Sequence, residues 1–146
     1  MTTICFCLNR RAISCDSRIT ADGEIITDEA DKRTVFNDVE FFLAGSLADR
    51  DTVCKAFTGR RRKIRSGIDM QALAWDGVTL WDITASDGEL SWHPVCSDRG
   101  AIGSGSPYAA SALHDGKTPR QAVMAAKRHD TGTGGKVVTH KLRSRV

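Results

Sequence analysis

The chain begins Met-Thr, and the threonine at position two has a hydroxyl that can act as a nucleophile. Once Met1 is removed, Thr2 carries a free α-amine with a pKa near ~8 on the same residue. That amine can take the proton of the hydroxyl as the oxygen attacks a carbonyl, so one residue supplies both nucleophile and base. Threonine is also an ordinary residue after a starting methionine, and the dipeptide alone leaves both interpretations open.

The cysteines are a second set of reactive side chains: Cys5, Cys7, Cys15, Cys54 and Cys96. Their number is odd and they lack CxxC spacing, which favours reduced thiols over a disulfide framework. Cys5 and Cys7 share one face of a predicted strand, but no pair of histidines lies near them. We interpret them as small buried apolar residues, and we expect no metal and no organic cofactor.

Length and composition predict one globular domain over residues 1–146, of which 40% are apolar. A net charge of +3 is too small to point to nucleic acid or a membrane as the main partner. No apolar run approaches the ~20 residues of a membrane span, and MTTICFC lacks the features of a signal peptide. We therefore expect a cytoplasmic protein.

Short apolar runs between turn residues predict strands through most of the chain. The candidate turns are Asn9-Arg10, Asp22-Gly23, Asn37-Asp38, Asp76-Gly77 and Asp87-Gly88. Apolar runs flank them: TTICFCL, RRAISCDSRIT, IIT, TVF, VEFFLAG, ALAW, VTLWDITAS and ELSWHPV, with KVVTHKL near the end of the chain.

Capping signals predict three helices among these strands. The first covers about 47–58 with Ser46 as N-cap, the second has Ser106 as N-cap, and the third begins at Thr118 with Pro119 in its first turn. The order is strands, one helix, strands, two helices and a strand. It predicts an α+β protein, a four-layer αββα sandwich of two antiparallel sheets flanked by helices.

A basic run, GRRRKIRSG, occupies residues 59–67. In a chain of modest net charge such a run usually forms a solvated loop, and a nucleic-acid patch is the alternative. A basic binding module would use Arg60 to Arg65 together with the tail from Lys141 to Arg145. It would show steep salt dependence, and the absence of interleaved aromatic residues counts against it, so we do not expect nucleic acid as a partner.

Six short motifs resemble those of proteasome β-subunits and HslV-type peptidases, members of the N-terminal-nucleophile hydrolase superfamily. They are TT from Thr2, DSRIT from Asp16, DKR from Asp31, AGS from Ala44, GSGSPYA from Gly103 and DTGTGG from Asp130. Each motif alone is weak, and GSGSP has too few glycines for a nucleotide site. Their order along nearly the whole chain is what carries the resemblance.

The resemblance implies roles for three polar residues near the start of the chain. Thr2 matches the family's nucleophile and α-amine base, Asp16 its aspartate after the second strand, and Lys32 the lysine beside the nucleophile. Such a lysine favours the deprotonated hydroxyl, and the aspartate holds the lysine in place and charged. Taken singly, Asp16 could instead cap a turn and Lys32 could be exposed.

Four further residues match supporting positions of the family. Gly45 matches the glycine of the family whose main-chain N–H resembles an oxyanion donor. A donor of this kind just before a helix N-terminus can stabilise the developing negative charge by ~3 to 4 kcal/mol. Ser104 matches a serine that hydrogen-bonds near the terminal amine, and Asp130 with Thr133 matches the pair supporting it. Gly45 could also be only a helix start, and GSGSP only a capped turn.

The resemblance also implies a substrate site. Main-chain groups of Thr20 and Gly45 would bind an extended peptide by strand addition. Ala30, Leu43 and Leu47 would line the first specificity pocket. Since Ala30 leaves room and the leucines are apolar, we expect cleavage after apolar side chains.

One departure concerns residues 57–72, where the family carries a second long helix. This chain has only GRRRKIRSGIDMQ there, so we expect that helix to be missing. The leading hypothesis is a threonine endopeptidase acting as a self-compartmentalising homo-oligomeric ring on peptides or unfolded proteins, with an ATP-dependent unfoldase implied by resemblance only. The alternative is a catalytically inactive proteasome-like ring that retains Met1.

Overall fold

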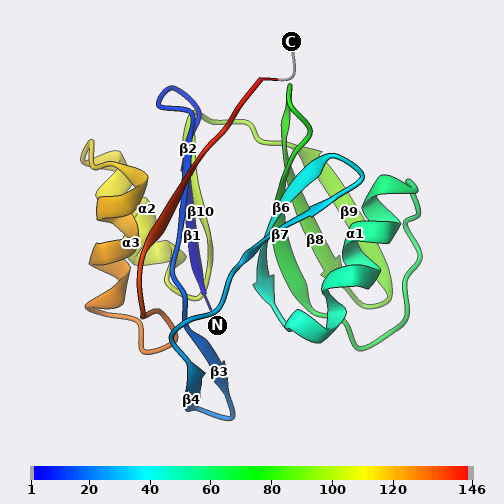
Figure 1. The fold of residues 1–146 in the computed structure, drawn as a ribbon, viewed down its shortest axis with the longest axis horizontal. Coiled ribbons are helices and arrows are strands. Elements are labelled where there is room, and N and C mark those ends of the chain that lie inside the picture. Colours follow the sequence, from blue (N-terminus) through cyan, green and yellow to red (C-terminus); the bar gives the residue numbers. More distant parts are fainter. Residues whose placement is uncertain (1, 145–146) are drawn as a thin grey trace. The chain divides into compact units, whose positions relative to one another are not determined.

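The computed structural model describes residues 2–144, whose strands and helices alternate in the order predicted from the sequence (Figure 1). The strands are β1 (Thr3–Cys7), β2 (Ala12–Cys15), β3 (Ile19–Ala21), β4 (Glu24–Thr27), β5 (Arg33–Phe36), β6 (Val39–Gly45), β7 (Met70–Trp75), β8 (Leu80–Ser86), β9 (Glu89–Pro94), β10 (Arg99–Gly103) and β11 (Val138–Lys141). The helices are the 3-10 turn η1 (Leu47–Asp49), α1 (Arg50–Thr58), α2 (Ser106–His114) and α3 (Pro119–Lys127). Neighbouring strands pair antiparallel, so the predicted α+β class is confirmed.

The chain forms two compact units. The first contains the residues up to Lys32 together with Cys96–Arg143, and the second contains Arg33–Val95. The first therefore holds β1 to β4, β10, β11, α2 and α3, while the second holds β5 to β9, η1 and α1.

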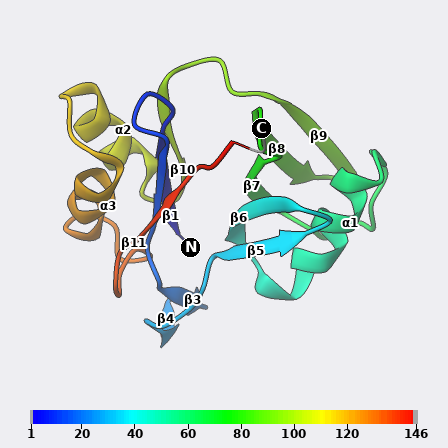
Figure 2. The same ribbon diagram turned by 45° about the horizontal axis from the view of Figure 1, so that its top comes forward.

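In the first unit, a four-stranded sheet has the order β10-β1-β2-β11. Its inner strand β1 is buried at all five positions, in keeping with the unbroken apolar sequence ICFC. Helices α2 and α3 cover one face of this sheet (Figures 1 and 2). The core between them is a cluster of small and branched side chains: Cys5, Ala109, Leu113, Ala122, Val123, Ala126 and Val137.

The β1–β2 hairpin sets the geometry of the candidate site. Its predicted turn is confirmed, because the Arg11 N–H donates to the Leu8 carbonyl at 3.0 Å and Arg11 adopts a left-handed φ of 50°. The pairing runs from Cys7 with Ala12 to Ile4 with Cys15. The Asp16 N–H then donates to the Thr3 carbonyl at 3.2 Å, so the end of β2 lies beside the start of β1.

The second unit is a five-stranded meander with the order β5-β6-β7-β8-β9. Left-handed φ values at Asn37, Asp38, Asp87 and Gly88 confirm two of the predicted turns. Helix α1 contributes Val53, Cys54 and Ala56 to a core with side chains from the sheet, among them Phe41 and Leu43.

Two predicted helix starts are wrong, the first by about three residues and the second by one residue. Residues 47–49 form a 3-10 turn, so the first α-helix begins only at Arg50, and the Ser46 side chain makes no capping hydrogen bond. Ser106 is the first residue of α2 rather than its cap, because the N-cap is Gly105. In both cases a serine next to a glycine resembles a cap, but its side chain makes no capping hydrogen bond.

The predicted start of the third helix is confirmed. Thr118 and Gln121 form a capping box in which the Gln121 N–H donates to the Thr118 hydroxyl at 3.2 Å. Each of the three α-helices in the described part of the chain has nine residues, and none of them can span a membrane.

The basic run at 59–67 contains no helix and is exposed at every residue except the partly buried Ile64. The run lies alongside the start of β9, where the Leu90 N–H donates to the Arg62 carbonyl at 2.6 Å. The Arg62 guanidinium lies 4.1 Å from the ring centre of Trp92, and Arg65 pairs with Asp49. Two of its cations thus have partners within the chain.

Candidate active site

Thr2 lies just before β1 and its side chain is buried, with 2% of the residue exposed. The Gly105 N–H donates to the Thr2 carbonyl at 3.4 Å. Gly103 packs so closely that a Cβ atom there would lie 1.9 Å from the same oxygen. The end of β10 and the start of α2 therefore fix the main chain of Thr2.

The side chain of Lys32 contacts the hydroxyl of Thr2. Its ammonium Nζ donates to the Thr2 hydroxyl, to Asp16 Oδ1 at 3.3 Å and to the Arg18 carbonyl at 2.7 Å. An ammonium has three N–H donors, so all of its hydrogen-bonding capacity is used. Lys32 is 3% exposed, which leaves it no solvent to compensate for a lost partner.

Asp16 is held by main-chain donors on both oxygens. Oδ1 accepts from the Thr3 N–H at 3.2 Å, and Oδ2 accepts from the Gly134 N–H at 3.0 Å and from the Arg18 N–H at 3.3 Å. These donors come from β1, from the loop after α3 and from the segment after β2. The carboxylate thus has a fixed position from which to hold the lysine.

Burial is the largest influence on the charges of this pair. It lowers the pKa of Lys32, against the attraction of Asp16. It also raises the pKa of Asp16, against Lys32 and the N–H donors from Gly134 and Thr3. The Lys32 ammonium therefore holds its proton less tightly than an exposed lysine does, while the carboxylate of Asp16 favours its charged form.

A second network lies beside the first. Ser104 and Thr133 both donate hydroxyl hydrogen bonds to Asp130 Oδ2 at 2.6 Å, and the Thr133 hydroxyl is 2.6 Å from that of Thr3. Burial alone would raise the pKa of Asp130, but the hydrogen bonds from Ser104 and Thr133 hold it below its usual value. The structure therefore brings together the three residues that the resemblance had grouped.

Two predicted substrate-binding residues also lie in this unit. Thr20 is the middle residue of β3 and is half-buried. Ala30 follows β4, where its N–H donates to the Ser17 carbonyl at 2.9 Å. Ala30 also lines a hollow of about 560 Å³ with Asp28 and Lys136.

The other predicted site residues belong to the second unit. Gly45 ends β6 with a φ of 151°, and a Cβ there would lie 3.0 Å from Met70 Cγ. The structure corrects the expectation that Gly45 directly precedes an α-helix, because the 3-10 turn η1 lies between Gly45 and α1. Leu43 is 1% exposed within the core beside α1, whereas Leu47 in η1 is 36% exposed.

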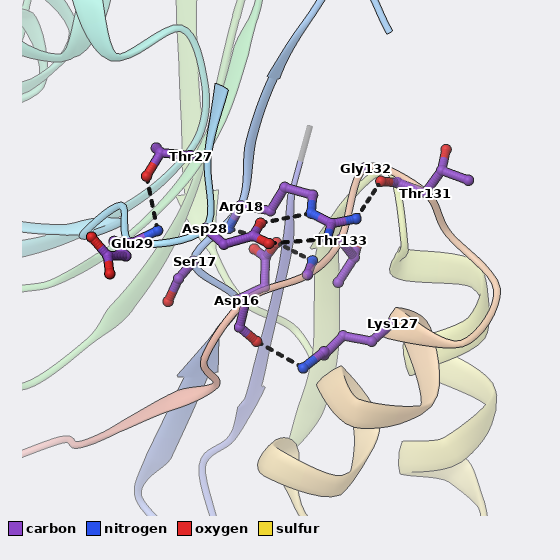
Figure 3. A network of polar contacts seen from close by, with 12 residues as sticks. Asp16, Ser17, Arg18, Thr27, Asp28, Glu29, Lys127, Thr131, Gly132 and Thr133 are labelled. Atoms are coloured by element: carbon purple, nitrogen blue, oxygen red, sulfur yellow. Dashed lines mark hydrogen bonds and ion pairs between the residues drawn. The ribbon is translucent and has the colours of Figure 1, made fainter. Parts of the chain in front are cut away.

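Sequence reasoning missed two participants. The Thr3 hydroxyl links β1 to the Asp130 network, whereas the TT motif assigns no role to Thr3. The Arg18 side chain pairs with Asp28 and reaches the Thr131 carbonyl (Figure 3). Their partners lie far away in the sequence or across a turn, so no local spacing could indicate them.

Comparison with known proteins defines the fold. No protein-family model and no curated protein matches the chain. Among solved structures, HslV of Trypanosoma brucei matches with a TM-score of 0.75 and 18% identity, over 95% of this chain and 98% of that one. BPH of Thiobacillus denitrificans matches with a TM-score of 0.69 and 17% identity over 97% and 98% of the two chains. The same protein in complex with epoxomicin matches with a TM-score of 0.67 and 19% identity over 97% and 99%.

These matches extend over nearly the whole chain at low identity. They establish that the chain has the fold of HslV and of BPH, so the HslV-type fold implied by the motifs is confirmed.

Proposed function

We propose that the chain is a threonine endopeptidase whose nucleophile is Thr2. The observation that carries the proposal is the buried ammonium of Lys32, which donates to the Thr2 hydroxyl while Asp16 and the Arg18 carbonyl hold it. A charge placed in this way, in a buried site, favours the deprotonated form of the hydroxyl. Burying the Lys32–Asp16 ion pair costs desolvation free energy, and a purely structural role for Thr2 would not require such a pair beside it.

In the proposed reaction, removal of Met1 first frees the α-amine of Thr2. The Thr2 oxygen then bonds to the carbonyl carbon of the scissile peptide, and its proton passes to the α-amine. The carbon–nitrogen bond breaks, the leaving amine takes that proton, and an ester to Thr2 remains. Water hydrolyses the ester, which restores the hydroxyl and releases the acid. Ser104, Asp130 and Thr133 are proposed to orient the amine.

Main-chain groups of Gly45 and Thr20 are the proposed contacts to the substrate backbone. The Gly45 N–H would donate to the developing oxyanion, and the Thr20 main chain would pair with an extended peptide. Ala30, Leu43 and Leu47 would form the pocket for the residue before the cleaved bond. No metal or organic cofactor takes part in this scheme.

We further infer that the two units form one domain over residues 1–146, with their sheets stacked in a four-layer αββα sandwich. The similarity to HslV over 95% of this chain supports that inference. From the motif resemblance we also propose a homo-oligomeric ring that encloses its peptide or unfolded-protein substrate in the cytoplasm, with an ATP-dependent unfoldase as partner. Light scattering combined with small-angle X-ray scattering would test both the assembly and the domain arrangement.

The decisive test of the activity combines intact mass with peptide turnover. The account expects the mass of the chain without Met1, turnover of short peptides, and loss of that turnover in Thr2→Ala. Thr2→Ser should retain part of the activity because it keeps the hydroxyl. A protein that retains Met1 and shows no turnover would instead be the catalytically inactive ring.

A further inference from the structure

The side chain of Arg18 joins two segments that flank the candidate site. Its Nε and Nη2 donate to the two oxygens of Asp28 at 2.8 and 3.2 Å, and its Nη1 donates to the Thr131 carbonyl at 3.1 Å (Figure 3). Asp28 follows β4, whereas Thr131 lies in the loop after α3. The planar guanidinium therefore acts as a clamp between the two segments.

The main chain of the same residue touches both members of the buried ion pair. Its N–H donates to Asp16 Oδ2 at 3.3 Å, and its carbonyl accepts from Lys32 Nζ at 2.7 Å. A shift of the Arg18 main chain would therefore move one partner of the carboxylate and one partner of the ammonium together.

Gly134 extends the clamp to a third point. A Cβ atom at Gly134 would lie 2.3 Å from Arg18 Cζ, so the guanidinium packs directly on this glycine. The Gly134 N–H donates to Asp16 Oδ2 at 3.0 Å. The same loop also carries Asp130 and Thr133, so the clamp supports both polar networks of the site.

We propose that the Arg18 guanidinium is a positioning residue for Lys32: by binding Asp28 and Thr131 it fixes the carbonyl that accepts from the lysine. The inference deepens the proposed function, since the position of Lys32 matters for catalysis only if Thr2 is the nucleophile. Arg18 itself touches neither Thr2 nor its hydroxyl in the described contacts.

Because the clamp is partly exposed, its effect on the position of Lys32 can be measured without a large change in the stability of the fold. The side chain of Arg18 is 20% exposed and that of Asp28 is 42% exposed. Ion pairs exposed to this degree contribute little to folding. Breaking the clamp should therefore leave the unfolding temperature nearly unchanged while it alters the surroundings of Lys32.

Asp28→Asn tests the clamp, because loss of the Asp28 charge and loss of the clamp would change the pKa of Lys32 in opposite directions. Loss of a nearby negative charge would lower the pKa of Lys32. Loss of the clamp would let water reach the ammonium, and this would raise its pKa toward the ordinary lysine value of 10.5, by about half a pH unit or more. The titration can be followed by NMR on the full chain with isotope-labelled lysine, assigned with Lys32→Arg.

Glu29→Gln is the matched control, because it removes the same charge one residue away and leaves the clamp intact. Arg18→Lys is the second test variant: it keeps the positive charge but lacks the fork that binds both Asp28 oxygens. We expect Asp28→Asn and Arg18→Lys to raise the pKa of Lys32, and Glu29→Gln to leave it unchanged or lower it slightly.

An unchanged or lowered Lys32 pKa in folded Asp28→Asn and Arg18→Lys would overturn the inference. Because the titration does not require peptide turnover, it tests the clamp independently of the proposed peptidase activity. In an active wild type, the rate of Thr2 acylation should also fall about tenfold in both variants, since small displacements of a catalytic group reduce rates strongly.

Discussion

The Lys32 ammonium donates a hydrogen bond to the Thr2 hydroxyl although the two residues lie in different segments of the first unit. Both are nearly excluded from solvent, with 3% and 2% of each residue exposed. Burying a lysine is costly unless its charge is satisfied, and Asp16 and the Arg18 carbonyl satisfy it here.

Replacing Lys32 by methionine should abolish peptide turnover. The substitution keeps the length and the apolar stem of the side chain but removes the charge from the Thr2 hydroxyl. We expect kcat to fall by about 100-fold or more, which is the usual scale for the loss of one donor that stabilises charge in the active site. Lys117→Met is the control, since Lys117 is exposed and lies between α2 and α3. Equal kcat values in the two variants would remove Lys32 from the mechanism.

The assigned substrate pocket predicts cleavage after apolar residues. In the proposed pocket, Ala30 would leave space and Leu47, which is 36% exposed, would offer apolar surface. A panel of short peptides that differ only in the residue before the cleaved bond should show the highest kcat/KM for leucine or a similar side chain. Preferential cleavage after aspartate or glutamate would contradict this assignment.

The Asp130 network predicts a component of stability that is lost in acid. Because Ser104 and Thr133 hold the pKa of Asp130 below the ordinary value of 3.8, the folded chain binds this proton less readily than the unfolded chain. The stabilisation is complete above that ordinary value and disappears as the pH falls through the lowered one.

Thr133→Val removes one of the two hydroxyl donors and should reduce this component. Urea unfolding of both proteins from about pH 6 to about pH 2 would measure it. The difference in stability between the wild type and Thr133→Val should shrink as the pH falls. A difference that stays constant with pH would mean that the hydroxyl does not influence the charge of Asp130.

Gly103→Ala should destabilise the chain and disturb Thr2. Gly103 has a φ of 96°, and its new Cβ would lie 1.9 Å from the Thr2 carbonyl oxygen. Gly116→Ala is the matched control, because Gly116 also has a positive φ, 85°, but nothing lies within 4 Å of the added atom. We expect Gly116→Ala to cost about 1 kcal/mol and Gly103→Ala at least ~2 kcal/mol more, as measured by denaturant unfolding. Equal losses would refute the close contact.

Much of the fold was predictable because its signals are local. The turns at Asn37-Asp38 and Asp87-Gly88 have residues that tolerate left-handed φ, and the apolar runs between turns have the length of strands. The capping box at Thr118 has both of its members within four residues. The starts of α1 and α2 were misplaced because neither Ser46 nor Ser106 forms a capping hydrogen bond.

The candidate site was predictable only through motif order. Thr2, Asp16 and Lys32 are brought together by the β1–β2 hairpin and the segment after β4, and the motifs indicated this grouping. The Arg18 clamp was missed because its partners include a carbonyl at Thr131, and any residue type provides a carbonyl. Contacts to the main chain leave little trace in a single sequence.

The central claim is that the hydroxyl and the α-amine of Thr2 act together, and a peptide epoxyketone tests it most directly. The hydroxyl can add to the ketone and the amine can open the epoxide, so stable double attachment requires both groups on one residue. Intact mass should show the chain without Met1 plus one inhibitor, and fragmentation should place the adduct on Thr2. An unmodified chain, or an adduct on a cysteine with Thr2 untouched, would contradict the account.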